Sequence, residues 1–316
     1  MKLSNYLRET LWLQYFSKIL ILIGMVLVFW GLGAFLSNII CLQVYGVDFT
    51  SFDFNSIKKE DANIIAALKV FQTLGGGIGM FLIPGLLFPK VINYDVNTML
   101  MYSRKPEAYQ ILTALVLVFL TVPAISWLYQ INQDMKFPEM WSDFEMRIRA
   151  MENQAAALTK VFVSADTIPM LLLNIFVVAL VPAICEEVFF RGIILQYTRY
   201  IFDKEWIAII ISSLVFSAFH GQFYGFLPRF ALGIVLGFVF MKTASIYPPL
   251  ILHFINNAMA VLMVYWGPHL PTIAVFDENY VFNWYWVILS FAASIAVCYW
   301  LQWYFKQSLY TQFKRK

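Results

Sequence analysis

Long apolar segments constrain this chain more than any other feature of its sequence. Of the 316 residues, 61% are hydrophobic and only 13% are charged, whereas soluble domains carry about 25% charged residues. A membrane-spanning helix needs about 20 predominantly apolar residues in a row, and eight segments of this chain can be considered as such spans. The sequence therefore predicts an all-α, polytopic membrane protein with about eight transmembrane helices around an intramembrane cavity.

Three of the predicted spans contain or adjoin residues that disturb a regular helix. The second is interrupted by glycines at 75–77 and by Pro84, which predicts close helix packing or a kink. The fifth and sixth are short, and the glycine-flanked stretch 221–225 between them predicts a turn or a re-entrant piece. The eight predicted spans are Phe16–Ile40, Asn63–Pro89, Ala108–Ile131, Ile168–Tyr200, Trp206–His220, Phe226–Met241, Pro249–Trp266 and Trp284–Phe305.

The distribution of positive charge predicts how the chain crosses the membrane. Lys and Arg are more numerous in the loops that would share a side with the N-terminus, so we expect both termini in the cytoplasm. The first apolar segment is expected to be a retained helix, because no small-residue cleavage site follows it. Short loops are typical of a bacterial inner-membrane protein. Segment 137–160 mixes charges with aromatics and predicts a connecting amphipathic helix on the membrane surface.

Two adjacent carboxylates lie where burial of charge is expensive. Glu186 and Glu187 follow Leu171–Cys185, in which Asn174 is the only strongly polar residue. A charge in the middle of a bilayer costs at least about 2.5–3.5 kcal/mol. Glu187 and Arg191 are four residues apart, the favourable order for an ion pair on a helix. The pair thus predicts either a structural cluster that braces helices or a functional site.

Two of the chain's three histidines lie in later apolar segments. His220 ends the fifth span. About 16 residues lead from Glu186 to the turn near 202–205, and about as many lead from that turn back to His220. Two helices of equal length on either side of a turn place Glu186 and His220 at similar depth. His253 and Asn257 are four apart and point to one helix face. His253 is expected to be shallower than Glu186, unless the fourth and fifth helices extend into the cytoplasm.

These residue types suit hydrolysis of a peptide bond without a covalent intermediate. Desolvated Glu186 could take a proton from water and return it to the leaving amine, while His220 holds the same water. His253 and Asn257 could donate hydrogen bonds to the oxyanion, with Glu187 held ionised by Arg191. Two His and two Glu could instead bind zinc, but no HExxH is present and the ligands would come from three helices. We therefore favour activation of water without a metal cofactor.

The order of these motifs resembles a known family. Three motifs, EExxxR at Glu186–Arg191, FxxxH at Phe216–His220 and HxxxN at His253–Asn257, are similar to those of the CAAX protease and bacteriocin-processing family, also called CPBP or Abi. Its CAAX members are type II prenyl endopeptidases. Each motif alone is a weak signal, but three in order on three apolar segments are specific. The resemblance covers Thr167–Trp266, about a third of the chain.

The resemblance implies an intramembrane endopeptidase with its site among the middle helices. In this assignment Glu186 is the base, Glu186 and His220 share the water, His253 and Asn257 form the oxyanion site, and Glu187 and Arg191 support them. Some descriptions of the family assign a metal, so zinc stays open. The chain is then divided into residues 1–166 (three helices and the amphipathic connector), 167–266 (the catalytic core) and 267–316 (the last helix and a basic tail).

The substrate and the competing functions stay open at this point. The expected partners are a peptide or protein substrate, membrane-anchored or prenylated in some members of the family, and the lipid bilayer, with no nucleic acid. A proton-coupled transporter would predict polar residues along a path and an internal repeat, neither of which is evident. A non-catalytic scaffold or bacteriocin self-immunity protein would use the motifs only structurally. Cys41, Cys185 and Cys298 are expected to be packed hydrophobes, and His269 a loop residue without a role.

Overall fold

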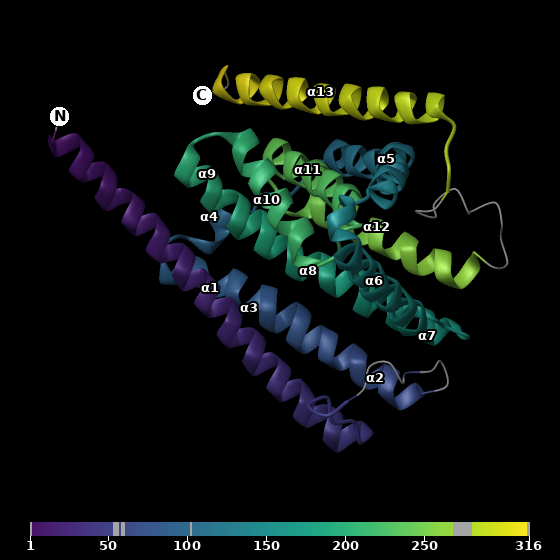
Figure 1. Ribbon diagram of the computed structural model, residues 1–316. Coiled ribbons are helices and arrows are strands. Elements are labelled where there is room, and N and C mark those ends of the chain that lie inside the picture. Colours follow the sequence, from purple (N-terminus) through teal and green to yellow (C-terminus); the bar gives the residue numbers. More distant parts are fainter. Residues whose placement is uncertain (1, 53–56, 58–60, 102, 268–279, 315–316) are drawn as a thin grey trace.

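The protein is a bundle of long helices. The computed structural model describes residues 2–52, 57, 61–101, 103–267 and 280–314, and all regular structure within these ranges is helical (Figure 1). In the first half, the helices are α1 (Lys2–Tyr45), α2 (Ala62–Phe71), η2 (Gln72–Leu82), α3 (Ile83–Val91), α4 (Val96–Leu100), α5 (Ala108–Asp134), η3 (Glu139–Trp141) and α6 (Ser142–Val163).

The second half holds the motif-bearing helices. They are α7 (Ile168–Asn174), η4 (Ile175–Leu180), α8 (Val181–Glu186), η5 (Glu187–Leu195), α9 (Gln196–Phe202), α10 (Glu205–Phe219), α11 (Phe226–Thr243), α12 (Tyr247–Trp266) and α13 (Trp284–Lys314). In Figure 1, α2 and α3 run beside α1, and α13 lies across the opposite side of the bundle over α5, in agreement with the contacts between these helices.

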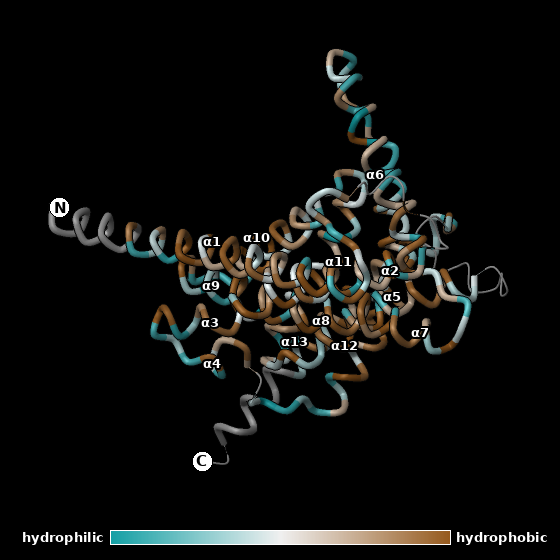
Figure 2. Tube along the Cα trace, turned by 90° about the horizontal axis from the view of Figure 1, so that it is seen from below, coloured by the Kyte–Doolittle hydropathy of each residue, from teal (hydrophilic) through white to brown (hydrophobic). Residues whose placement is uncertain are grey.

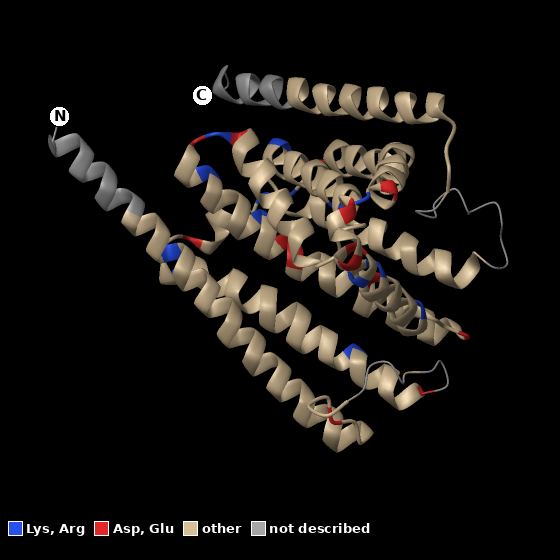
Figure 3. Ribbon diagram, in the orientation of Figure 1, with Lys and Arg blue, Asp and Glu red and all other residues tan. Residues whose placement is uncertain are grey.

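The predicted membrane spans are confirmed, with one exception in length. Within the described residues, seven helices are long and apolar enough to cross a bilayer, and α10, the fifth predicted span, is a shorter apolar helix of 15 residues. The seven are Leu13–Tyr45, Ala62–Val91, Ala108–Asp134, Ile168–Phe202, Phe226–Thr243, Tyr247–Trp266 and Trp284–Tyr304. Figure 3 shows long stretches of ribbon without charged residues, as helices that face lipid require. The protein is an integral membrane protein.

Two continuous helices widen into π-helix just before a proline. η2 ends two residues before Pro84, and η4 ends two residues before Pro182. Proline lacks the N–H that bonds to the carbonyl four residues earlier, and its ring clashes with that carbonyl. A wider π-turn at this point relieves the clash without ending the helix. The predicted interruption of the second span is therefore a local change of winding within a continuous helix.

The glycines of η2 permit a close approach to α1, as the sequence predicts. A Cβ on Gly79 would lie 2.7 Å from the carbonyl oxygen of Phe29, and one on Gly33 would lie 2.8 Å from that of Leu74. A Cβ on Gly75 would lie 3.4 Å from the backbone of Ala34. The two helices thus meet backbone to backbone, which is the usual way that small residues join helices in membranes.

The helix that carries the acidic pair is longer than a bilayer is thick. Ile168–Phe202 has 35 residues, which corresponds to about 52 Å at 1.5 Å per residue, against a hydrocarbon core of about 30 Å. It ends at Asp203, which has a left-handed φ of 51°, and α10 begins two residues later at Glu205. The turn predicted at 202–205 is confirmed.

Helix α6 differs from the rest of the bundle. Figure 2 shows it projecting away from the other helices, with hydrophilic and hydrophobic residues mixed along its length. Only Val163, its last residue, is buried. Asn174 fixes this end, because its Nδ2 donates to the carbonyls of Val163 at 2.6 Å and Ser164 at 3.2 Å. The amphipathic helix predicted between 137 and 160 therefore exists, with its C-terminal end tied to α7.

Candidate active site

Glu187 is the centre of a buried polar cluster at the start of η5. Its side chain has 0% exposure, and its Oε1 accepts hydrogen bonds from Arg191 Nη1 at 2.8 Å and from His253 Nδ1 at 2.8 Å. Arg191 lies four residues along the same helix, and His253 comes from α12. The predicted Glu187–Arg191 ion pair is confirmed. Because His253 of α12 donates to the same oxygen atom, Glu187 also connects η5 to α12.

The Arg191 side chain is fixed on three sides. Besides Glu187, its Nη2 donates to the carbonyl oxygen of Gly233 at 3.4 Å, and its guanidinium lies 4.8 Å from the centre of the Phe216 ring. The absence of a side chain at Gly233 permits α11 to pack closely against α10 beside Arg191. A Cβ at position 233 would lie 2.9 Å from the Cβ of Ser213. The carboxylate, the carbonyl and the aromatic face compensate part of the loss of water by this buried guanidinium, while its Nε has no hydrogen-bond partner among the described residues.

Glu186 faces the same histidine from the other side. Its Oε2 lies 3.8 Å from His253 Nε2, and no group in the described part of the chain donates a hydrogen bond to this buried oxygen. A separation of 3.8 Å is too long for a direct hydrogen bond. Both atoms can, however, contact a third polar atom placed beside them. The Glu186 side chain is 15% exposed, whereas Glu187 is fully buried, so the two carboxylates have different environments, as predicted.

Phe216 holds the two histidines together. The ring centre of Phe216 lies 5.0 Å from that of His220 and 5.7 Å from that of His253, both edge-to-face. His220 is the residue that follows α10, and its Nδ1 contacts the carbonyl oxygen of Phe216 at 2.9 Å. A carbonyl only accepts, so Nδ1 carries the proton and Nε2 of the neutral ring is left as an acceptor.

The same reasoning fixes the tautomer of His253. Nδ1 contacts the carboxylate of Glu187 and therefore carries a proton. Nε2, which faces Glu186, accepts a hydrogen bond when the ring is neutral and donates one when the ring is protonated. Asn257 lies one turn further along α12, and its Oδ1 accepts a hydrogen bond from Asn256 Nδ2 at 3.4 Å. The Asn257 amide nitrogen is then the end available to donate.

The structure favours the second of the two arrangements considered for His253. Its side chain approaches that of Glu186 to 3.8 Å, and Ile168–Phe202 is long enough to extend well past the hydrocarbon. Its acidic pair consequently meets α12 near that helix's start. The structure therefore brings Glu186, Glu187, Arg191 and His253 into one cluster, with His220 joined to it through Phe216.

The residues at this site do not form a ready-made metal centre. In the ranges that the structure describes, no three His, Cys, Asp or Glu side chains are grouped as metal ligands. Glu187 Oε1 and His253 Nδ1 are bonded to each other. A zinc-bound histidine usually makes such a bond through its second nitrogen, so His253 Nε2 is the nitrogen that could face a metal. Zinc stays an alternative, and the mechanism below uses only side chains of the protein itself. Cys185, just before the pair, is a buried free thiol, as is Cys41, and Cys298 is half-buried.

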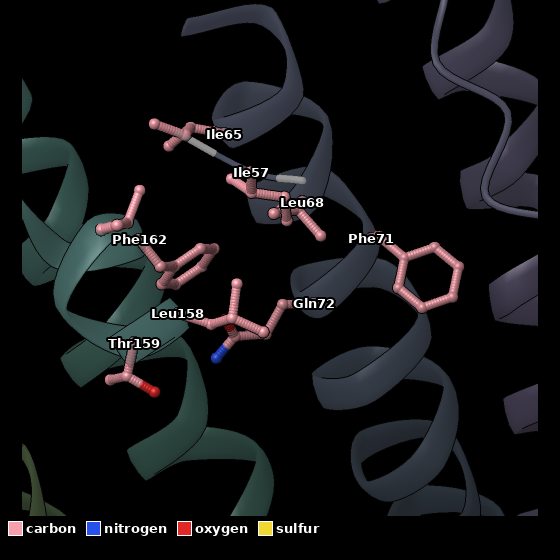
Figure 4. Close-up of a pocket in the computed structure, with 9 residues that line it drawn as sticks. Ile57, Ile65, Leu68, Phe71, Gln72, Leu158, Thr159 and Phe162 are labelled. Atoms are coloured by element: carbon pink, nitrogen blue, oxygen red, sulfur yellow. The ribbon is translucent and has the colours of Figure 1, made fainter. Parts of the chain in front are cut away.

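Neither of the two pockets that we describe coincides with this cluster. The first, of about 200 Å³, lies between α2 and the C-terminal part of α6, where side chains of the two helices face each other (Figure 4). It is mainly apolar, with Gln72 and Thr159 among its lining residues. The second lies where residues 165–166 meet the end of α12. The cavity predicted around Glu186 stays a prediction, and His269 lies outside the described residues.

The motif-bearing helices match a known family. Residues 168–259 match the family described as "Type II CAAX prenyl endopeptidase Rce1-like". This range contains all three motifs and the whole polar cluster. Over these residues the chain is similar to the CAAX prenyl endopeptidases, as the order of its motifs predicts.

A curated relative points the same way over a limited range. The chain is 31% identical over 119 residues to a Bacillus subtilis protein named "Putative membrane peptidase YdiL". This match covers 36% of the present chain and 44% of the relative, so it spans less than half of that protein. No solved structure matches the chain. The likeness to these peptidases therefore concerns the middle helices, and the first three long helices are described by their structure alone.

Two features of this CAAX protease-like site were not predicted from the sequence. Phe216 was part of a motif, but its position between both histidines and Arg191 depends on how α10 crosses η5. The second is a set of contacts from α6 to the loop after His220. The only sequence signal for these contacts was the mixture of charged and aromatic residues in 137–160, which a connector on the membrane surface would explain equally well.

Proposed function

We propose that this protein is an intramembrane endopeptidase of the CAAX protease type, in which Glu186 activates water for attack on a peptide bond. The observation that carries the proposal is the arrangement around His253. Nδ1 of this ring is held by Glu187, while Nε2 faces Glu186 Oε2 at 3.8 Å. Glu186 Oε2 is buried and accepts no hydrogen bond from the described residues, so it is suited to hold a water.

The proton movements follow from the hydrogen bonds. Glu186 takes one proton from the water as its oxygen attacks the carbonyl carbon, and His220 Nε2 accepts a hydrogen bond from the other O–H. When the C–N bond breaks, protonated Glu186 returns the proton to the leaving amine. Arg191 and His253 both donate to Oε1 of Glu187 and so favour its ionised form over proton uptake, although its Oε2, like that of Glu186, has no donor among the described residues.

The oxyanion site uses the second histidine. His253 Nε2 donates to the oxyanion in the protonated state of the ring, and Asn257 Nδ2 supplies a second donor. With His253 protonated, the cluster holds two carboxylates, one guanidinium and one imidazolium, so its charges sum to zero. A neutral total is the least costly way to keep four ionised groups away from water.

The decisive test is turnover by purified protein with Glu186→Gln as the key variant. Gln has the same shape but cannot take the proton, so we expect cleavage of a fluorogenic peptide panel to fall by at least about 10²-fold, the scale of general base catalysis. Glu205→Gln is the matched control. Glu205 is a surface carboxylate at the first residue of α10, at the opposite end of that helix from His220, and it pairs with Lys242 of α11. Its turnover should equal that of the wild type.

Further arms of the assay separate the alternatives. The panel should contain prenylated and unprenylated peptides, each with and without a chelator. Cleavage lost on chelation would replace the metal-free proposal by a zinc-dependent one. Full turnover by Glu186→Gln would refute the mechanism. If the wild type cleaves nothing while Glu186→Gln retains the cellular role, the protein is a scaffold or self-immunity protein.

A further inference from the structure

The loop after His220 is held by side chains that come from outside the motif-bearing helices. Glu152 of α6 accepts hydrogen bonds from the backbone N–H of Phe223 at 2.6 Å and of Tyr224 at 3.2 Å. Asn132 of α5 donates to the carbonyl oxygen of Phe223 at 2.9 Å and accepts from the N–H of Leu227 at 2.7 Å. The loop backbone is thus satisfied by two helices that carry none of the three motifs.

A second layer fixes the side chains of the same loop. The guanidinium of Arg149 lies 3.8 Å from the centre of the Tyr224 ring. Glu145 holds Arg149 Nε at 2.9 Å and also accepts from the N–H of Phe137 at 2.8 Å. The ring of Phe137 in turn lies 4.9 Å from that of Phe223. We call this set of residues, Glu145, Arg149 and Glu152 on α6 with Asn132 on α5, the loop clamp.

The loop clamp acts close to His220. Only two residues lie between His220 and Phe223, and Gly221 has a left-handed φ of +64°. His220 and Gly221 are the last residues bonded to α10, through their N–H groups to the carbonyls of Ser217 at 3.2 Å and Ala218 at 3.0 Å. The end of a helix frays unless something beyond it is tied down. The position of the His220 ring therefore depends on where the loop is held as well as on its own contact with the Phe216 carbonyl.

The clamp is attached to a helix that does little else in the fold. Val163 is the only buried residue of α6, so α6 contributes little apolar burial to the stability of the bundle. Its polar contacts are instead concentrated on the loop and on the end of α5. Loss of a clamp contact should therefore move the loop rather than unfold the protein.

We propose that Glu152 and Arg149 are positioning residues that set the location of His220 for the reaction. This inference rests on the proposed peptidase function, since it is the work of His220 that the clamp would control. Glu152 acts on the backbone at Phe223 and Tyr224, and Arg149 acts on the Tyr224 ring. Neither residue touches Glu186, Glu187 or His253 through any contact described above, so both act through the loop.

The test combines hydrogen exchange with kinetics on the full-length protein in detergent micelles. In Glu152→Ala, the amides of 223 and 224 lose a charged acceptor, and we expect their exchange to rise by at least about tenfold. The kcat should fall by a similar factor with KM unchanged, because the substrate contacts are intact. Glu152→Gln keeps an acceptor oxygen and should recover most of both effects. Arg149→Lys, which keeps the charge but loses the planar stack, should give a smaller rise.

Asp143→Asn is the matched control, because Asp143 is an exposed carboxylate near the start of the same helix. It should match the wild type in exchange, kcat and melting temperature. Unchanged exchange at 223–224 in Glu152→Ala would overturn the clamp. Faster exchange with unchanged kcat would overturn the positioning of His220. If the wild type cleaves no peptide, the peptidase proposal fails, whereas the exchange result still decides whether the clamp exists.

Discussion

The protein contains two Glu–Arg pairs with the same spacing in two very different regions. Glu187 and Arg191 lie four residues apart on η5 at 2.8 Å, and Glu145 and Arg149 lie four apart on α6 at 2.9 Å. The first pair is almost fully buried, with exposures of 0% and 1%, whereas the second is 17% and 34% exposed. The spacing and the contact distance are therefore nearly the same, although Arg191 donates through Nη1 on a π-helix and Arg149 through Nε on an α-helix, and the surroundings differ most.

The surroundings decide what each pair can do. Removal of one partner from a buried pair leaves an uncompensated charge away from water, which costs about 3–5 kcal/mol. An exposed pair contributes about 0–1 kcal/mol, because water replaces the lost partner. The buried pair can thus hold a charged cluster in one state for chemistry. The exposed pair is better suited to hold a loop that the protein must be able to adjust.

The largest expected effect is the loss of Arg191. In Arg191→Ala, Glu187 and the carbonyl of Gly233 both lose a donor, so the free energy of unfolding should fall by about 3–5 kcal/mol. Arg149→Ala should cost only about 1–2 kcal/mol, for the exposed pair and the stack on Tyr224 together. Reversible unfolding of both variants in mixed micelles would give the two values under the same conditions.

A double mutant sharpens this test. Adding Glu187→Gln to Arg191→Ala removes the unpaired charge and should recover at least about 1 kcal/mol, whereas Glu145→Gln added to Arg149→Ala should show coupling below about 1 kcal/mol. Equal losses for Arg191→Ala and Arg149→Ala would show that burial does not separate the two pairs.

A smaller effect is expected from the helix contact beside the buried pair. In Gly233→Ala, the new Cβ would lie 2.9 Å from the Cβ and 3.1 Å from the Cα of Ser213, so α10 and α11 must separate. Overpacking of this kind costs about 1–3 kcal/mol, and it moves the carbonyl that Arg191 Nη2 contacts. Turnover should fall together with melting temperature.

Gly24→Ala is the matched control for this substitution. Outside the backbone of its own helix, no described atom lies within 4 Å of a Cβ at Gly24, so stability should not fall and should rise by at most about 1 kcal/mol from the higher helix propensity of Ala. A stable and fully active Gly233→Ala variant would show that the buried pair does not need this close packing.

The smallest effect is a pH dependence of the exposed pair. The backbone N–H of Phe137 and then the Arg149 side chain hold the pKa of Glu145 below its ordinary value of 4.5. Because the pKa of Glu145 is lower in the folded protein, the stability that its ionised carboxylate contributes is complete above pH 4.5. This stability is lost as the pH falls through the lower pKa of the folded state. Exchange at Phe137, corrected for intrinsic rates, should therefore rise below pH 4.5 in the wild type.

Glu145→Gln provides the control, because its amide does not titrate in this range. Exchange at Phe137 in this variant should show no acid-dependent rise. The same rise in both proteins would assign the acid response to another group. A wild type without any rise would show that Glu145 does not hold the loop clamp together.

The sequence predicted most of the helices because they depend on local properties. Apolar length placed the spans, and the αL residue Asp203 lies in the turn predicted at 202–205. The Glu187–Arg191 pair followed from helical spacing alone. The chemical roles of Glu186, His220, His253 and Asn257 stay predictions, since neither the structure nor the family match tests them.

Other features depend on long-range geometry that no local pattern encodes. The sequence left the depth of His253 relative to Glu186 open, because this depth depends on how far Ile168–Phe202 extends past the bilayer, which the span length alone does not fix. The loop clamp joins Glu152 to an amide 71 residues away in the chain. Nothing in the composition of α6 distinguishes a side chain that holds such a loop from one that faces water.

The backbone contact between α1 and η2 has a thermodynamic consequence. Both helices are already out of water before they meet, so docking exchanges lipid tails for protein backbone and hides almost no surface from solvent. Heat-capacity changes come from altered hydration. Separation of α1 should therefore carry almost no heat-capacity signature, and its equilibrium should respond to the packing of the surrounding lipid chains far more than to the temperature dependence of water.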